Sequence, residues 1–362
     1  MYMKILYDHQ AFMQIIGGVS RSYVELIRHL NTDVEYEIAL KYSRNIYIKD
    51  LLPTIKYPFA NFSIPFKRRI IKRINFDNSI ERLINSDYDL FHSTFDDAYF
   101  LPYLKTPFVI TVHDLIPEHD PDNWSKLWLE SRKEVFNKAS QIVAVSQHTK
   151  NDLLYFYPEI CESNVTVIHH GYSIPLQSNH GDNAYGDYIL YVGSRGGYKN
   201  FNRFIEAITP ILKNNKGLRL LCTGSVLTKV EQIFLTGLGV FDRVIAKQFD
   251  DQTLRVLYVN ALVFVFPSLI EGFGIPILEA WGNHCPVALS NRSCFPEIAA
   301  NAAIYFDPED TSSIYNAITN ILESPSLRDE IVTNGNERLK LFDWKGSAEK
   351  LTQVYLKAVN ST

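Results

Sequence analysis

The chain has 362 residues, of which 46% are hydrophobic and 21% charged, and its formal net charge is -4 at pH 7. Because one hydrophobic core rarely serves more than about 250–300 residues, this length predicts two domains. The composition excludes a disordered chain, and the slightly acidic balance argues against a nucleic-acid-binding protein.

The first apolar run, residues 3–7, predicts a buried strand. Asp8 and His9 end this run too early for a signal peptide, and no run approaches the roughly 20 apolar residues that span a bilayer. The four cysteines form no C-x-x-C pair, so neither a zinc site nor a disulfide framework is indicated. We therefore expect a cytoplasmic protein.

In the first half of the chain, short apolar strands alternate with helical periods, as is typical of parallel α/β sheets. The expected strands are residues 3–7, 36–40, 90–92, 108–112 and 141–145. A helix is expected over residues 19–30. Gly17 and Gly18 precede this helix, and their amides could reach an anionic ligand, although a flexible turn is the alternative.

The segment 66–74 combines a basic face with apolar residues at helical spacing. Its basic residues are Lys67, Arg68, Arg69, Lys72 and Arg73, and its apolar residues are Phe66, Ile70, Ile71 and Ile74. Such a helix could rest on an anionic membrane surface. The alternative is a surface helix that packs its apolar stripe on the core.

His113 follows the expected strand at residues 108–112. It could hydrogen-bond a ligand hydroxyl or position a second substrate, with Asp114 orienting its ring. The alternative is a buried histidine with a structural role.

A polar stretch with glycine and proline over residues 173–187 predicts a linker. The strands expected after it are residues 188–193, 218–222, 244–246, 262–266 and 287–289. Two successive Rossmann-type halves are therefore predicted. Ligands of such sheets bind outside the carboxyl ends of the strands.

The loop that leaves the strand at residues 188–193 carries two cations, Arg195 and Lys199, and Gly193 lets the backbone turn sharply there. A guanidinium fork and an ammonium point charge together match a diphosphate, and they can stabilise charge on a departing phosphate. Solvated loop charges are the alternative. Because these cations would serve the phosphate, we expect no metal in catalysis, even at the acidic sequence of residues 95–97.

The most informative segment is residues 267–280, which read PSLIEGFGIPILEA after an apolar strand. A glycine turn leads into a helix here, so the amides of Gly274 and Ile275 can bind an anion at the helix N-terminus. Glu271 and Glu279 stand on either side of this turn. Because carboxylates repel phosphate, we expect them to bind the hydroxyl groups of a sugar and a ribose.

This pair of glutamates, with G-F-G-I-P among the seven residues between them, resembles the signature of retaining glycosyltransferases of family 4, also described as glycosyltransferase group 1. The resemblance implies an α/β fold of the GT-B type, in which two Rossmann-like domains face each other across a cleft. It also implies an acceptor-binding domain over residues 1–172, completed by the last helix at 344–362. A donor-binding domain would follow over residues 188–343.

The resemblance further implies roles for individual residues. Glu279 would bind ribose hydroxyls, Glu271 would lie near the donor sugar, and the loop amides would bind the diphosphate. The expected catalytic residues are Arg195, Lys199, Glu271 and His113. The expected donor-binding residues are Gly17, Gly18, Gly193, Phe273, Gly274, Ile275 and Glu279.

The implied reaction is retaining transfer of a hexose from a nucleotide diphosphate sugar, GDP-mannose or a similar donor, to a glycan or lipid-linked glycan. The sequence His-Asp-Leu-Ile-Pro at residues 113–117 resembles bacterial mannosyltransferases of surface polysaccharide synthesis. Such an enzyme needs no cofactor besides its nucleotide-sugar co-substrate, and it would act in the cytoplasm or at the inner face of the cell membrane. The alternatives are a nucleotide-sugar epimerase of the same fold and a non-catalytic nucleotide-sugar-binding protein.

One departure from the family pattern follows the helix that carries Glu279. Where the family usually places a glycine, this chain has Asn283 and His284. If that position needs the left-handed conformation, one of these two residues must accept a modest strain.

Overall fold

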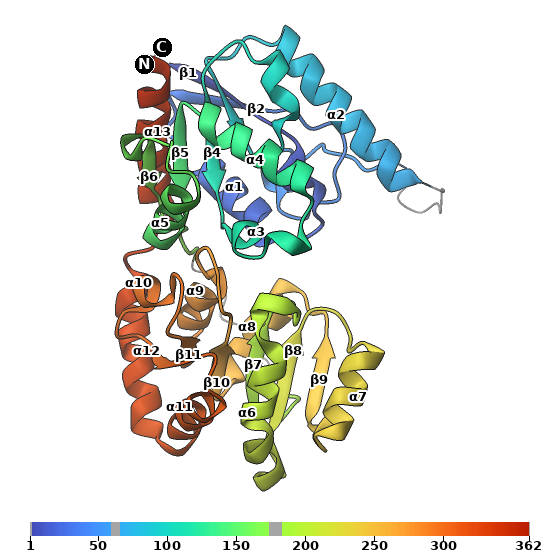
Figure 1. Ribbon diagram of the computed structural model, residues 1–362, viewed down its shortest axis with the longest axis vertical. Helices are drawn as coiled ribbons and strands as arrows, with labels where there is room; N and C mark the ends of the chain where they lie inside the picture. Colours follow the sequence, from blue (N-terminus) through green and yellow to red (C-terminus); the bar gives the residue numbers. More distant parts are fainter. Residues whose placement is uncertain (1, 59–65, 174–182, 362) are drawn as a thin grey trace. The chain divides into compact units, whose positions relative to one another are not determined.

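The computed structural model describes residues 2–58, 66–173 and 183–361. Most of the predicted linker, namely residues 174–182, lies outside the described residues. The chain divides into two compact units (Figure 1). Unit 1 comprises Met1–Gly171 and Asp343–Thr362, and unit 2 comprises Tyr172–Phe342.

Unit 1 contains a six-stranded parallel sheet in the order β2-β1-β3-β4-β5-β6. The strands are β1 Met3–Tyr7, β2 Val34–Ile38, β3 Leu90–Ser93, β4 Phe108–Val112, β5 Gln141–Ala144 and β6 Val165–Val167. The central strands β3, β4 and β5 are buried along their whole length. Strands of this kind read as continuous apolar runs because helices cover both faces of a parallel sheet.

Six α-helices belong to unit 1, within the residues that the structure describes. They are α1 Gly18–Arg28, α2 Lys67–Asn85, α3 Ile116–His119, α4 Lys126–Lys138, α5 Gln147–Phe156 and α13 Trp344–Asn360. The short 3-10 helices are η1 Gln10–Met13, η2 Ile48–Asp50, η3 Ala98–Tyr103, η4 Pro121–Asn123 and η5 Glu162–Asn164.

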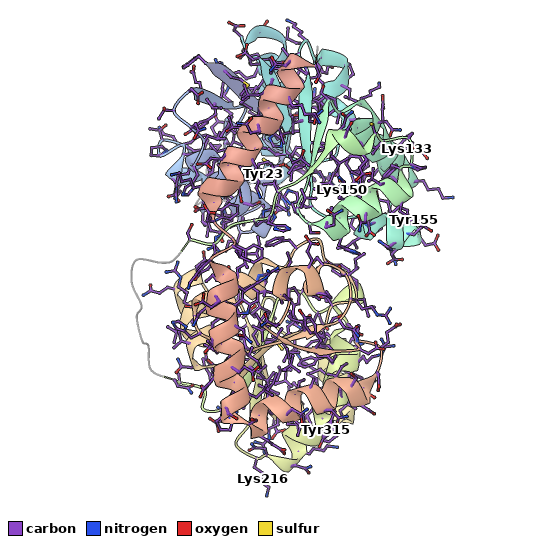
Figure 2. All side chains as sticks on the ribbon, turned by 90° about the vertical axis from the view of Figure 1, so that its left-hand side faces the viewer. Tyr23, Lys133, Lys150, Tyr155, Lys216 and Tyr315 are labelled. Atoms are coloured by element: carbon purple, nitrogen blue, oxygen red, sulfur yellow. The ribbon has the colours of Figure 1, made fainter. Side chains whose placement is uncertain are left out.

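Side chains alternate between the two faces of the sheet in unit 1, which gives two core layers. Tyr7 of β1 packs in one layer with Tyr23 of α1, a buried residue labelled in Figure 2, and with Tyr355 of α13. Leu6 packs in the other layer, with Phe136 of α4. The first and last helices of the chain therefore complete the same core, and both chain ends lie in unit 1 (Figure 1).

Unit 2 contains a second six-stranded parallel sheet, in the order β12-β11-β10-β7-β8-β9. The strands are β7 Tyr188–Val192, β8 Arg219–Thr223, β9 Val244–Lys247, β10 Val263–Phe266, β11 Val287–Ser290 and β12 Ile304–Phe306. Numbered from β7, this is the strand order 3-2-1-4-5-6 of dinucleotide-binding folds. The order reverses between β7 and β10.

The helices of unit 2 alternate with its strands. They are α6 Phe201–Asn214, α7 Lys229–Gly237, α8 Asp251–Asn260, α9 Ile275–Gly282, α10 Phe295–Ala299, α11 Thr311–Glu323 and α12 Pro325–Leu339, with 3-10 helices η6 Gly197–Lys199 and η7 Phe241–Arg243. The predicted α/β class with two Rossmann-like halves is confirmed. Within the described ranges, no helix is both long and apolar enough to cross a bilayer.

The observed strands differ from the predicted ones mainly at the sheet edges. The edge strands β6 and β12 were not predicted, and β2 begins at Val34 instead of residue 36. α1 begins at Gly18, and η1 lies between β1 and this helix, so the two glycines do not follow the first strand directly.

Candidate functional site

The carboxyl ends of two neighbouring strands of unit 2 meet where the strand order reverses. β7 and β10 are hydrogen-bonded neighbours, and the chain continues from them toward opposite edges of the sheet. In open α/β sheets, such a switch point is where ligands bind. The loops that follow the two strands are joined by the N–H of Leu269, which donates to the carbonyl of Tyr198 at 2.8 Å.

Lys199 and Glu271 form an ion pair at this switch point, with 2.5 Å between Nζ and Oε1. Their side chains are only 14% and 12% exposed. The ammonium group also lies over the rings of Tyr198 and Phe266, at 5.1 and 5.3 Å from the ring centroids. The structure therefore brings two of the predicted catalytic residues into direct contact in a mostly buried place.

Asn200 fixes the loop that carries Lys199. Its backbone is left-handed, with a φ of 57°. Its side-chain amide donates to the carbonyls of Pro267 and Pro308 at 3.2 and 2.7 Å, which ties this loop to the loops after β10 and β12. Asn200 was not among the predicted site residues, although asparagine tolerates the left-handed region better than most residues.

Ser293 holds the loop that carries Glu271. The backbone N–H of Glu271 donates to Ser293 Oγ at 2.9 Å, and this hydroxyl donates to the Glu271 carbonyl at 2.6 Å. Cys294 Sγ contacts the carbonyl of Phe273 at 3.2 Å. Ser293 was also missed, because its partner lies 22 residues away in the sequence.

Gly274 turns the chain from this loop into α9, with a φ of 97°. A Cβ atom at this position would lie 2.9 Å from Ile277 Cδ1, so the turn requires glycine. Ile275 is the first residue of α9, so its amide lies at the positive end of the helix dipole. The predicted Phe273 has a buried side chain, edge-on to Phe342 at 5.8 Å, which places its ring in the core of unit 2.

Glu279 lies on the second turn of α9. Tyr258 of the neighbouring helix α8 donates to Glu279 Oε2 at 3.3 Å. Because Tyr258 is buried, this hydrogen bond holds the Glu279 carboxylate in a fixed position beside α8.

Arg195 has a different partner from Lys199. Gly193 turns the chain out of β7 with a φ of 124°, and Arg195 then pairs with Glu231 of α7 at 2.7 Å between Nε and Oε1. Burial alone would raise the pKa of Glu231, but hydrogen bonds from Arg195 and from the Thr228 backbone lower it on balance. Arg195 Nη1 is buried and has no hydrogen-bond partner in the described part of the chain.

In unit 1, Gly17 and Gly18 lie at the start of α1. A Cβ atom on Gly17 would lie 2.1 Å from Gln14 Oε1, so glycine lets the side chain of Gln14 approach the backbone. Among the described residues, no side-chain hydrogen bond caps this helix start. The first backbone N–H groups of α1 can therefore bind an anion.

His113 leaves β4 and packs among aromatic residues of unit 1. Its ring is edge-on to Tyr23 at 5.7 Å and stacked on His170 at 5.8 Å. Burial, and then the charge of Arg132, lower the pKa of His113 to about 4. Nε2 is buried without a hydrogen-bond partner among the residues described, while Asp114 accepts from the N–H of Ile116 rather than orienting the ring.

Arg132 of α4 holds the loops after β3 and β4 together, a role that was not predicted from the sequence. It is 3% exposed, pairs with Asp96 at 2.7 Å and with Glu118 at 3.2 Å, and donates to the carbonyl of Asp114 at 2.5 Å. Burial raises the pKa of Asp96 to about 6, although the charge of Arg132 opposes this shift. In the described ranges, no group of three or more His, Cys, Asp or Glu residues could hold a metal ion.

Two family models match successive parts of the chain. One is described as glycosyl transferases group 1 and matches residues 177–338. The other is described as glycosyltransferase family 4 and matches residues 16–174. Together the two matches cover most of the chain.

Curated relatives and solved structures extend this similarity over the whole chain. The O-antigen chain mannosyltransferase B of Escherichia coli is 24% identical over 98% of this chain and 99% of its own length. The O-antigen chain mannosyltransferase RfbU of Salmonella typhimurium is 28% identical over 62% of this chain and 63% of its own.

Two solved structures have the same fold. Sucrose-phosphate synthase from Thermosynechococcus elongatus superimposes with a TM-score of 0.75 at 18% identity, over 99% of this chain and 100% of its own. Anabaena Alr3699/HepE, solved with UDP and glucose, gives a TM-score of 0.74 at 18% identity, over 97% and 98% of the two chains. These likenesses confirm the predicted GT-B fold class.

Proposed function

Because this chain belongs to the glycosyltransferases of the group 1 and family 4 type, we propose that it transfers a hexose from a nucleotide diphosphate sugar to a glycan acceptor, with retention of anomeric configuration. The proposal depends above all on the Lys199–Glu271 pair at the switch point of unit 2. It is supported by relatives named as O-antigen mannosyltransferases and by a protein of the same fold that was solved with UDP and glucose. GDP-mannose is therefore the first donor to test.

Donor binding would change the partners of the central ion pair. The diphosphate competes with Glu271 for Lys199, and the amides of Gly274 and Ile275 offer further donors to phosphate oxygens. Glu271 then becomes an acceptor for hydroxyl groups of the donor sugar. Glu279 would accept hydrogen bonds from the ribose hydroxyls.

In the transfer step, the bond between the anomeric carbon and the β-phosphate oxygen breaks. The acceptor hydroxyl oxygen forms its new bond to the same face of that carbon, and its proton passes to the departing phosphate. Lys199 stabilises the charge that develops on this phosphate. Arg195 stabilises the same phosphate charge through its buried Nη1, while Glu231 holds the guanidinium in place. His113, neutral at pH 7, binds a substrate hydroxyl through Nε2.

Substitutions of Lys199 and Glu279 test this function. We expect Lys199→Ala to lower kcat for transfer or for slow donor hydrolysis about 100-fold or more, because the leaving phosphate loses a fixed cation. Glu279→Ala should instead weaken nucleotide binding, measured by calorimetry. The matched control is Lys216→Ala, which removes an exposed lysine of unit 2 (Figure 2) and should leave both quantities unchanged. Wild-type rates in Lys199→Ala would contradict the assignment.

The donor and the metal requirement can be tested on the wild-type protein. A thermal-shift screen against UDP, GDP, dTDP and their sugars identifies the donor, because a bound ligand raises the melting temperature by mass action. We propose that the reaction is metal-independent, since Lys199 and Arg195 supply the cations. Transfer should therefore persist in excess EDTA, and its loss on chelation with recovery on adding a divalent cation would contradict this.

We also propose that the start of α2 contacts an anionic membrane surface that carries a lipid-linked acceptor. Phe66 and Ile70 are 69% and 50% exposed, whereas Ile71 is buried, so only part of the apolar stripe packs on the core. The first turn of α2 holds no acidic residue. Because cations oppose the dipole at a helix N-terminus, helix stability does not explain the basic residues there.

Sedimentation with vesicles tests the membrane contact. Binding to vesicles that contain phosphatidylglycerol should fall at least about tenfold when the five cations are replaced by glutamine, since each contributes roughly 1 kcal/mol near an anionic surface. These cations are Lys67, Arg68, Arg69, Lys72 and Arg73. The control is Lys216→Gln. Unchanged binding of the five-fold variant would exclude the contact.

A further inference from the structure

Three aromatic side chains, Phe95, Trp124 and Trp128, lie together at the surface of unit 1, and we refer to them as the aromatic patch. The rings of Trp124 and Trp128 are stacked, with centroids 5.1 Å apart and planes 28° apart. The rings of Phe95 and Trp128 have centroids 6.4 Å apart and planes 31° apart. Trp124 is 42% exposed and Phe95 39%. Single exposed aromatic residues are ordinary, but a row of neighbouring rings indicates a binding surface.

The aromatic patch lies at the edge of the sheet where ligands are expected. Phe95 comes two residues after β3, and Trp124 and Trp128 follow β4 through α3 and η4. β3 and β4 are paired neighbours in the parallel sheet, so their carboxyl ends lie side by side. His113 also follows β4, and its Nε2 has no hydrogen-bond partner within the part of the chain that the structure describes.

A buried arginine holds the aromatic patch in place. The guanidinium of Arg132 lies over the ring of Trp128 at 5.3 Å, and its Nε pairs with Asp96, the residue after Phe95. The same guanidinium donates to the carbonyl of Asp114. Two members of the aromatic patch are therefore fixed relative to each other and to the loop that carries His113. A fixed surface loses little conformational entropy when it binds a ligand.

The charge around the aromatic patch favours a neutral polar ligand over an anionic lipid surface. Asp120 and Asp122 are exposed just before Trp124, and Glu130 is exposed after Trp128. One exposed lysine, Lys126, lies between the two tryptophans, so these four residues carry a net negative charge. Carboxylates repel phosphate head groups, but they accept hydrogen bonds from hydroxyls. The aromatic patch thus differs from the basic start of α2, which has the opposite charge.

We propose that the aromatic patch binds sugar rings of the glycan acceptor. This inference rests on the proposed function and identifies where unit 1 holds the acceptor. Sugar rings present C–H groups on one face, which pack on the electron-rich faces of aromatic rings, and hydroxyls at their edges, which hydrogen-bond to polar side chains. The stacked rings of Trp124 and Trp128 supply the first kind of contact. The neighbouring carboxylates supply the second.

Tryptophan fluorescence measures this binding directly. The chain has four tryptophans, and Trp281 and Trp344 are only 1% and 5% exposed, so acrylamide quenching reports mainly on Trp124 and Trp128. We expect linear trisaccharides of mannose, galactose or glucose to protect the wild-type protein from quenching. Trp124→Ala should abolish this protection and raise KM for a glycan acceptor about tenfold, with donor hydrolysis unchanged. Trp124→Tyr should restore most of the affinity.

Two matched variants separate stacking from other causes. Leu127→Ala removes an apolar side chain that is 83% exposed beside the aromatic patch but cannot stack on a sugar. Tyr155→Ala removes a ring of α5 that is 78% exposed and lies outside the aromatic patch (Figure 2). Both should keep the wild-type KM for glycan.

Several outcomes would overturn the inference. One is that no trisaccharide protects the wild-type protein, and another is that Trp124→Ala keeps the wild-type KM. Equal losses in Trp124→Ala and Leu127→Ala, together with lost binding to vesicles, would assign the aromatic patch to lipid instead. Failure of the wild-type protein to bind or hydrolyse any nucleotide sugar would refute the proposed function alone, because quenching still tests sugar binding to the aromatic patch.

Discussion

His284, at the end of α9, has a φ of 54°, whereas the φ of Asn283 before it is -117°. A residue with a Cβ atom in the left-handed region costs roughly 1–2 kcal/mol, and glycine avoids this cost. We expect His284→Gly to raise the free energy of unfolding by about 1 kcal/mol, after allowing for the greater freedom of glycine in the unfolded chain. Urea denaturation measures this change.

Asn283→Gly is the control for this substitution. Asn283 is outside the left-handed region, and its side chain donates to the Glu279 carbonyl at 2.8 Å, so glycine there should destabilise the protein. A lower stability of His284→Gly than of the wild type would contradict the strain at this position. The sequence identified the pair of candidates for this strain, but the choice between them depends on how the chain leaves α9.

Other residues of the candidate site show the same limit of sequence-based prediction. The glutamate motif and the loop with Lys199 were found because their spacing is local and distinctive. The partner of Arg195 could not be found, because Glu231 lies 36 residues further along and is brought near only by the fold. Ser293 and Arg132 act by holding loops in place. A single serine or arginine has no local sequence pattern that would indicate such a role.

At the scale of elements, α12 supports the helix that carries Glu279. Gly335 of α12 is buried against Trp281 of α9, and a Cβ atom there would lie 2.4 Å from Trp281 Cδ1. We expect Gly335→Ala to lower the free energy of unfolding by about 2 kcal/mol, because a rigid indole must move in a packed core. It should also weaken nucleotide binding, since α9 would shift with its tryptophan. Urea denaturation and calorimetry measure the two effects.

Gly237→Ala is the matched control for this helix contact. Gly237 ends α7, and a Cβ atom there would meet no atom within 4 Å. Its substitution should leave stability within about 0.5 kcal/mol of the wild type. Equal effects of the two substitutions would show that the approach of α12 to α9 is not close.

The strands that could be predicted from the sequence are more deeply buried than those that could not. Central strands such as β4 and β10 are buried along their length, so they read as apolar runs between turn signals. β6 and β12 have three residues each and lie at sheet edges, with partly exposed side chains. Three residues are too few to show a period, and only pairing with a neighbouring strand defines them.

At the scale of the whole molecule, the two units differ in their buried histidines. Unit 1 buries His9, His92 and His170, and it packs His113 beside them. Burial lowers the pKa of each, to about 3 for His92 and about 4 for His113. In unit 2, the described residues include one histidine, His284, and it is exposed.

From these lowered pKa values we expect unit 1 to be more sensitive to acid than unit 2. Below pH 6.5 the unfolded chain binds protons on histidines that stay neutral in the fold, so stability is lost as the pH falls toward 4. The raised pKa values of Asp96 and Glu118 oppose this loss, because those carboxyls bind protons more readily when folded. Because four histidines have lowered pKa values and only two carboxyls have raised ones, we expect unit 1 to lose stability on balance between pH 7 and pH 5.

Hydrogen exchange at pH 7.5 and pH 5.0, corrected for the intrinsic rates, tests this difference within one molecule. The amides of β1, β3 and β4 should lose protection at pH 5.0 by about tenfold or more, whereas those of β7, β8 and β10 should keep theirs. Unit 2 serves as the internal control, because general acid unfolding would affect both sheets. Equal losses, or earlier loss in unit 2, would show that the histidines of unit 1 do not govern its stability. If unit 1 alone opens, its acceptor sites should be lost in acid before nucleotide binding by unit 2.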